Sequence, residues 1–175
     1  MKFLYHPLNL NAPHTKPTRE WISANEEKYG IITRVVDIND YASPSHFLQD
    51  YWGKGEDILY MAWDVLPTNK MVEEMINCKY GLCAQAAYIY PVHTGLKEPV
   101  IALRNRGEDG SLMWIKKGEK FADCFNMELT KFSVWAQSRI GDVPECHWQK
   151  IDNELSKQSP IKTHVHWPEI IHNQA

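Results

Sequence analysis

Short apolar runs alternate with longer amphipathic segments along the first half of the chain. Strands are predicted at residues 2–8, 31–36, 58–63 and 82–90, and helices at 18–29, 43–52 and 68–78. The run at 58–63 is apolar throughout, which is typical of a central strand with both faces covered. Strands that alternate with helices of this length indicate right-handed βαβ units. We therefore expect an α/β fold with a mostly parallel central sheet flanked by helices.

The second half of the chain has a less regular pattern. Segments 100–103 and 112–115 flank a glycine-containing loop and are predicted to pair as a hairpin. A short edge strand is predicted at 125–129, helices at 130–140 and 145–157, and an extended segment at 161–167. This half is therefore expected to be smaller, irregular and partly antiparallel. A chain of 175 residues is long enough for one domain with a substantial core, so a single domain is expected over 1–175.

Three residues mark expected helix boundaries. Thr68 is expected to cap the helix at 68–78, and Ser43, followed by Pro44, to cap the helix at 43–52. Gly30 is expected to end the helix at 18–29. The loops after the strands then lie at the end of the sheet where parallel strands finish, here called the carboxyl edge. Ligands of open α/β sheets bind at this edge.

Composition narrows the classes of function. The formal net charge is -3 and the sequence pI is about 6.2, with no Lys/Arg cluster, so nucleic-acid binding is disfavoured. No apolar run approaches the ~20 residues that span a bilayer, and no basic region followed by a long apolar core opens the chain. We therefore expect no transmembrane segment and a cytoplasmic location.

Cysteines and aromatic residues leave alternatives open. The four cysteines form no Cys-x-x-Cys pair, and free thiols are favoured over disulfides. Seven tryptophans and eight tyrosines are many for this length. Four aromatic residues of the second half suit either a sugar-stacking subsite or the core, namely Trp114, Phe125, Trp135 and Trp148.

Two aspartates follow predicted strands. Asp64 comes directly after the apolar run, and Asp37 follows the strand at 31–36. Because parallel strands finish at the same edge of a sheet, both carboxylates are expected to face one crevice. The alternative for each is an aspartate that serves only a turn or a helix cap, where this residue is favoured.

Two histidines and a third aspartate add candidate chemistry. His164 and His166 lie on the same side of the extended segment, which suits either a shared metal ion or an exposed edge strand. His172 could complete a site with them. Asp64 and His166 together are a sensible donor set for Mg²⁺ or Mn²⁺. Asp152, one helical turn after Trp148, suits a general base beside an aromatic wall or a solvated helical residue.

Segments that follow one another through most of the chain carry a family resemblance. They are the first strand with its proline-rich loop, then 35–37, 58–67, 126–133, 148–155 and 164–168. In this order they resemble the GT-A family of nucleotide-sugar-dependent glycosyltransferases, especially small single-domain forms such as those encoded by viruses of hyperthermophilic archaea. The most specific segment is 58–67, because an apolar strand of the family ends in Asp-x-Asp, followed by apolar residues and often proline. The resemblance implies a GT-A-like (Rossmann-like) sheet, with 1–91 as the nucleotide-binding half and 92–175 as the acceptor-side half.

The resemblance also implies a donor and a cofactor. Asp64 falls on the last aspartate of the motif, which binds a divalent cation, Mn or Mg, that bridges the diphosphate of a nucleotide-sugar. Asp37 falls where the family holds the nucleoside, and His6 and Pro7 fall at the loop that lines the base. His166 resembles a late histidine that joins the metal.

Transfer to an acceptor hydroxyl is the implied activity. Asp152 resembles the acid that acts as general base in the inverting branch, and the acceptor is a protein, a glycan or a lipid. A viral origin would make the location the host cytoplasm. Ala62 stands where the family usually has the first aspartate, so the motif is Ala-Trp-Asp. A GT-A-like domain without turnover is therefore an alternative. A nucleotidyltransferase or a dinucleotide-binding dehydrogenase is disfavoured, because no glycine-rich loop follows the first strand.

Overall fold

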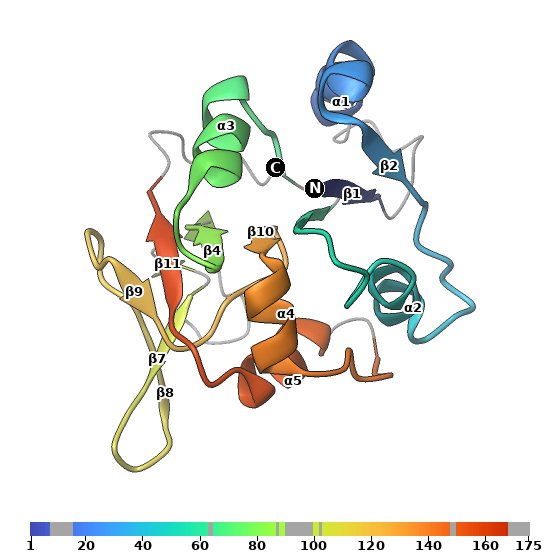
Figure 1. The fold of residues 1–175 in the computed structure, drawn as a ribbon. Helices are drawn as coiled ribbons and strands as arrows, with labels where there is room; N and C mark the ends of the chain where they lie inside the picture. Colours follow the sequence, from blue (N-terminus) through green and yellow to red (C-terminus); the bar gives the residue numbers. More distant parts are fainter. Residues whose placement is uncertain are drawn as a thin grey trace.

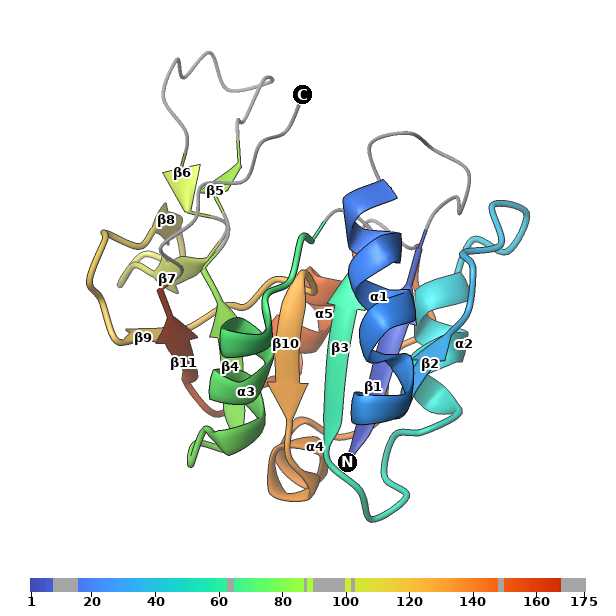
Figure 2. The same cartoon turned by 90° about the horizontal axis from the view of Figure 1, so that it is seen from above.

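A seven-stranded mixed sheet forms the centre of the molecule (Figure 1). The computed structural model describes residues 1–7, 16–62, 65–86, 88–89, 100–101, 103–147 and 150–167. In spatial order the strands are β2 (Ile31–Thr33), β1 (Lys2–His6), β3 (Ile58–Ala62), β10 (Leu129–Phe132), β4 (Leu82–Gln85), β11 (Thr163–His166) and β9 (Phe121–Ala122). Strands β1, β2, β3, β4 and β11 run parallel to one another, and β9 and β10 run in the opposite direction (Figure 2).

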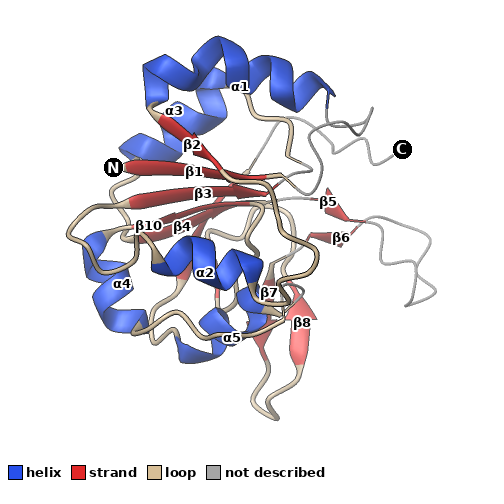
Figure 3. Ribbon diagram, turned by 90° about the vertical axis from the view of Figure 1, so that its right-hand side faces the viewer, coloured by secondary structure: helices blue, strands red, loops and turns tan. Residues whose placement is uncertain are grey.

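Helices cover both faces of this sheet (Figure 3). Helices α1 (Lys16–Tyr29) and α3 (Asn69–Asn77) lie on one face, here called the α3 face. Helices α2 (Ser43–Gln49), α4 (Val134–Ile140) and α5 (Ile151–Gln158) lie on the other. The α/β class expected from the alternating pattern is confirmed. The sheet is mixed, with five of its seven strands parallel and with β9 and β10 antiparallel to them. No helix in the described part of the chain is both long and apolar enough to cross a membrane.

Two apolar cores lie on the two faces of the sheet. Side chains of β1 and β3 alternate between them, so that Phe3 and Leu59 belong to the core under α1 and α3 while Leu4 and Ile58 belong to the core shared with α2, α4 and α5. All four side chains are fully buried. The uninterrupted apolar run of β3 is therefore explained by cover on both faces, as expected.

Two small two-stranded sheets accompany the central one. Strands β5 (Tyr88–Ile89) and β6 (Val100–Ile101) pair with each other, as do β7 (Arg104–Arg106) and β8 (Leu112–Trp114). The strand predicted at 82–90 is thus divided between β4 and β5. The predicted hairpin loop is confirmed, but its first strand is β7, because 100–101 pairs with β5 instead.

The largest difference from the sequence prediction is β10. The sequence predicts a short edge strand at 125–129 and a helix at 130–140. Both predictions are wrong around residues 129–132, which the structure places in a strand. Residues Leu129–Phe132 form a strand between β3 and β4, antiparallel to both. All four are buried, including Lys131, so no alternation of polar and apolar positions marks them as a strand. Helix α4 begins afterwards, with Ser133 as its N-cap.

The predicted helix boundaries have mixed outcomes. Thr68 Oγ1 accepts a hydrogen bond from the Met71 N–H, so Thr68 is the N-cap of α3 as predicted. Gly30 follows α1 with a φ of 60°, a conformation that favours glycine. The N-cap of α2 is Ala42 rather than Ser43, because Ser43 already lies in the first helical turn and its hydroxyl bonds elsewhere. All four cysteines are free thiols.

Candidate functional site

A buried histidine ends the first strand at the carboxyl edge. His6 Nδ1 lies 3.0 Å from the Tyr60 hydroxyl on β3, and His6 Nε2 lies 3.4 Å from Ser43 Oγ on α2. The same Ser43 oxygen accepts the backbone N–H of Asp37 at 3.0 Å. These four residues, here called the His6 network, tie the end of β1 to the loop after β2. Two positions singled out in the sequence, His6 and Asp37, are thus joined through Ser43, a contact that spacing alone does not indicate.

Burial keeps His6 neutral. The side chain is fully buried, and its burial, together with the Arg34 guanidinium, lowers the pKa of His6 to about 4. A neutral imidazole donates from one nitrogen and accepts at the other, which matches two hydroxyl neighbours. His6 therefore fixes the position of the loop rather than presenting a charge.

Asp37 and Pro7 lie beside this network with different exposure. The Asp37 side chain is exposed, and its Oδ1 accepts the Asn39 N–H at 2.9 Å, forming a turn. Pro7 is buried, and its carbonyl accepts the Val36 N–H at 2.8 Å. The loop after β1 and the loop after β2 therefore run side by side at the carboxyl edge, with the Asp37 carboxylate facing solvent.

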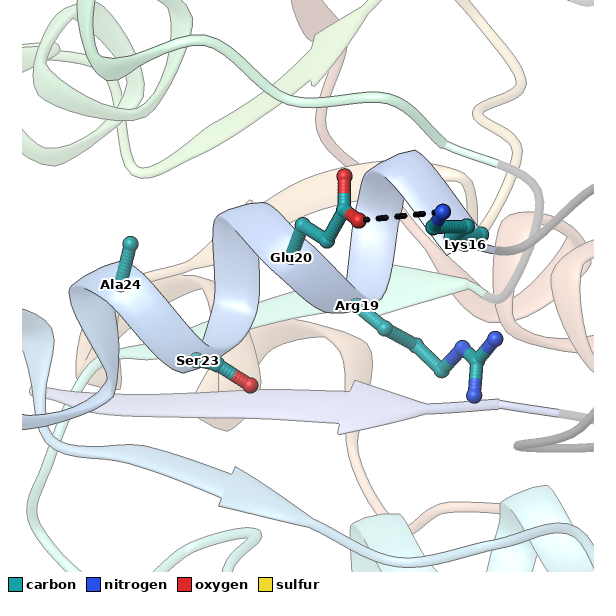
Figure 4. Close-up of a pocket in the computed structure, with 5 residues that line it drawn as sticks. All are labelled: Lys16, Arg19, Glu20, Ser23 and Ala24. Carbon is teal, nitrogen blue, oxygen red and sulfur yellow. Dashed lines mark ion pairs between the residues drawn. The ribbon is translucent and has the colours of Figure 1, made fainter.

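Helix α1 begins at the same edge and contacts the segment after β3. Thr18 Oγ1 donates a 2.9 Å hydrogen bond to the carbonyl of Val65. Arg19 follows Thr18, and Figure 4 shows its side chain extending toward the end of the sheet where the parallel strands finish. Lys16 and Glu20 instead pair with each other at 3.7 Å on the exposed side of the helix. Arg19 Nε is buried and has no hydrogen-bond partner within the described part of the chain.

Asp64 lies outside the described residues. Strand β3 ends at Ala62, and α3 packs over β10 and β4 on the α3 face. Val65, the first described residue after Asp64, is buried and contacts the start of α1.

Asp152 lies in the first turn of α5, on the face opposite α3. Helix α5 leads through a short connection into β11, so it runs antiparallel to that strand and begins toward the carboxyl edge, as Figure 2 shows. Burial raises the pKa of Asp152 by more than the Asn153 N–H and the Arg104 guanidinium lower it. Arg104 itself donates to Asn153 Oδ1 at 2.6 Å. Trp148, the proposed aromatic neighbour, lies outside the described residues.

A cluster of one cysteine and two histidines lies on the α3 face. Cys78, His164 and His166 each offer a ligand atom, and these three atoms lie within 4.8 Å of one another. Cys78 follows α3, while both histidines point from β11 to the same face. They line a cavity of about 470 Å³ together with Glu74, Asn77, Lys79, Tyr80 and Lys120. Strand β11 lies between β4 and β9, so the two histidines are not on an edge strand.

Both histidines of this cluster are held toward the neutral form that binds metals. Burial lowers the pKa of His166 to about 4, with further contributions from His164 and Lys131. Burial also lowers the pKa of His164, assisted by Lys79 and Lys120. The buried Nε2 of His166 has no hydrogen-bond partner among the described residues. A soft thiol and two imidazoles are donors that suit Zn²⁺ rather than Mg²⁺.

The aromatic residues proposed for a sugar subsite are dispersed. Phe125 is buried in the core, Trp114 is half-buried under the Arg104 guanidinium, and Trp135 is 53% exposed on α4. These three side chains therefore do not form one stacking surface.

Sequence reasoning did not single out Arg19 or Ser43 for a site, and it treated Cys78 only as a thiol. Arg19 could have been identified as an anion-binding candidate from its position, because it is a basic residue in the first turns of the helix that follows the first strand. Cys78 carries no such local signal, because its partners come from the other end of the chain.

Comparison with models of known protein families finds no family that matches the chain, and comparison with curated proteins finds no matching relative.

Proposed function

We propose that the protein is a GT-A-like glycosyltransferase that moves a sugar from a nucleotide-sugar donor to an acceptor hydroxyl. The observation that carries this proposal is the hydrogen bond from Thr18 to Val65. It holds the start of α1, which also carries Arg19, beside Val65, the residue that follows Asp64 in the sequence. Helix N-termini and guanidinium groups both favour anions, so this end of the sheet suits the diphosphate of the donor.

Asp64 is the proposed ligand of a divalent cation, Mn²⁺ or Mg²⁺. Its carboxylate oxygens are hard donors of the kind these ions prefer. When bound, such an ion neutralises the negative charge that develops on the leaving diphosphate. Arg19 would act on the same charge from the helix side. His166 is left out of this proposal, because its ring faces His164 and Cys78 on the α3 face.

The loops beside the His6 network are the proposed nucleoside-binding region. The exposed Asp37 carboxylate suits hydrogen bonds with ribose hydroxyls, and the buried Pro7 holds the loop proposed to line the base through its carbonyl, which accepts the Val36 N–H. His6, with both ring nitrogens near hydroxyl partners, holds these loops in place. It therefore acts as a positioning residue.

Asp152 is the proposed general base. A carboxylate whose pKa is raised accepts a proton more readily, and burial raises the pKa of Asp152. In the proposed reaction it takes the proton of the acceptor hydroxyl as that oxygen attacks the anomeric carbon opposite the leaving diphosphate. A single displacement of this kind inverts the configuration of the sugar.

Calorimetric titration with nucleoside diphosphates and nucleotide-sugars, with and without Mn²⁺, tests the proposal. We expect metal-dependent binding of one nucleotide, lost in Asp64→Ala. Arg19→Met should weaken binding about tenfold to a hundredfold, as expected for a lost charged hydrogen bond. Lys16→Met is the matched control, because Lys16 is exposed and pairs with Glu20. Absence of binding across the panel would overturn the proposal and favour a GT-A-like domain without turnover, for which Ala62 in the Asp-x-Asp motif is the sequence sign.

A further inference from the structure

We propose that Cys78, His164 and His166 form a zinc-binding site on the α3 face of the sheet. This site lies between the end of α3 and β11, away from β1 and β3 in the strand order, and does not depend on the proposed transferase activity. The cavity that the three residues line lies beside the last turn of α3, where Glu74 and Asn77 face it. Helix α3 begins at the carboxyl edge and ends at the opposite edge, so its last turn is the part farthest from the proposed nucleotide.

The distances fit tetrahedral coordination. Bonds of ~2.3 Å to sulfur and ~2.0–2.1 Å to nitrogen, at the tetrahedral angle, place a sulfur and a nitrogen ligand about 3.6 Å apart. Cys78 Sγ and His164 Nδ1 are separated by 3.6 Å. The ligand atom of His166 lies within 4.8 Å of both. To reach tetrahedral distances, the His166 ligand atom must move toward the other two by roughly an ångström. A small change of side-chain torsions is sufficient for such a movement.

The surrounding structure holds the ligands in place before any ion binds. The Lys131 ammonium donates to the carbonyls of Ile76 and Cys78, at 3.0 and 2.9 Å, and so fixes the backbone that carries the thiol. The His164 ring stacks on Tyr80, with ring centroids 4.2 Å apart. Pairing with β4 sets the register of both histidines on β11. Supporting contacts of this kind orient metal ligands and raise affinity.

The ligand set identifies the class of ion. Thiolate and imidazole donors select Zn²⁺ among the common divalent cations, whereas Mg²⁺ and Mn²⁺ prefer oxygen. The thiolate that binding requires also supplies negative charge beside Lys79, Lys120 and Lys131. Three protein ligands leave a fourth position of the tetrahedron, and this position borders the cavity. A water molecule or a small anion would occupy it.

Titration of the full chain with Co²⁺ and then Zn²⁺ tests the site. We expect one Co²⁺ per chain, with tetrahedral visible bands and a thiolate-to-metal band in the near ultraviolet, both removed by Zn²⁺. Cys78→Ser should abolish the thiolate band, and His164→Asn should weaken binding at least about tenfold. Cys146→Ser is the matched control, since Cys146 is also a half-buried free thiol and lies outside the cluster. A thiolate band that survives in Cys78→Ser, or no Co²⁺ binding by the unmodified chain, would overturn the proposal.

A second measurement on the unmodified protein covers the case in which a variant fails to fold. Zn²⁺ should protect Cys78 from alkylation by iodoacetamide, as read by mass spectrometry of peptides, while Cys146 remains reactive at its metal-free rate. Equal protection of both thiols, or of neither, would contradict the site. Because neither readout requires a nucleotide, failure of the transferase proposal would leave this result unaffected.

Discussion

Cys78 Sγ lies 3.6 Å from His164 Nδ1, although 86 positions separate the two residues in the chain. Cys78 lies in the short connection between the end of α3 and the start of β4. The contact exists because β11 pairs with β4 in parallel. His164 stands opposite Cys83 in that register. A late strand thus carries its histidines back to the end of α3, and the two parts of the cluster meet only when the sheet is complete.

Replacement of Lys131 by Met is expected to lower the free energy of unfolding by about 2–3 kcal/mol. The buried ammonium satisfies two carbonyls at the end of α3, and hydrogen bonds from a charged group contribute about 1.5–3 kcal/mol. Because one of these carbonyls belongs to Cys78, Zn²⁺ affinity should also fall about tenfold. Urea denaturation and Zn²⁺ titration measure the two effects. Lys120→Met, at an exposed lysine of the same cavity, should change stability little, and an unchanged Zn²⁺ affinity in the Lys131 variant would rule out its positioning role.

His6 is expected to make the fold sensitive to acid. The unfolded chain protonates this histidine below pH 6.5, whereas the folded chain does so only near pH 4. The free energy of unfolding should therefore fall as the pH decreases from 6.5 to about 4, by up to about 3 kcal/mol for this group. Above pH 6.5 the contribution is constant.

Chemical denaturation at several pH values checks this effect. His6→Phe removes the titrating ring, so the stability difference between the parent chain and this variant should shrink as the pH decreases through that interval. Ser43→Ala is the matched control, because it removes a partner of His6 and retains the ring. It should lower stability at neutral pH while keeping the acid dependence. If the free energy of unfolding changed with pH in the same way in the parent chain and in His6→Phe, the acid sensitivity could not be assigned to His6.

Asp152→Asn is expected to reduce kcat by about 10²- to 10⁴-fold, the usual loss when a general base is removed. The KM for the donor should change little, because Asp152 is proposed to act on the acceptor. If the parent chain has the proposed activity, the acidic limb of its kcat/KM profile should lie above the ordinary carboxyl pKa, since burial raises the pKa of Asp152. Glu154→Gln is the control, as Glu154 lies in the same turn and pairs with Lys157 at 2.7 Å. Equal losses in both variants would argue for a structural effect.

Phe132→Ala is expected to lower the free energy of unfolding by about 3–5 kcal/mol, as large-to-small changes in a packed core do. Phe132 is fully buried in β10 and contacts the rings of Trp52 and Phe125. Trp135→Ala, three residues later on α4, should cost far less because Trp135 is 53% exposed. Urea denaturation of both variants makes the comparison. Similar losses in the two would contradict the assignment of Phe132 to a central strand.

Local patterns were sufficient for much of the fold. The apolar run of β3, the Thr68 cap, the glycine after α1 and the alternation of Thr163 and Val165 with His164 and His166 all depend on near neighbours in sequence. Side-chain periodicity and capping chemistry act over a few residues, so they can be read from the chain directly. The same patterns brought Asp37 and Asp152 forward as candidates at strand and helix ends, and the family resemblance added His6.

Long-range pairing accounts for the rest. The placement of β10 between β3 and β4 depends on two partners far away in sequence, and a strand covered on both faces carries no alternating signal. Lys131 lies in the segment predicted as a helix at 130–140, yet it is a buried residue of β10, where the end of α3 supplies carbonyls for its ammonium. The Cys78 cluster and the contact between His6 and Ser43 arise in the same way. Each joins groups that only the completed sheet brings within bonding distance.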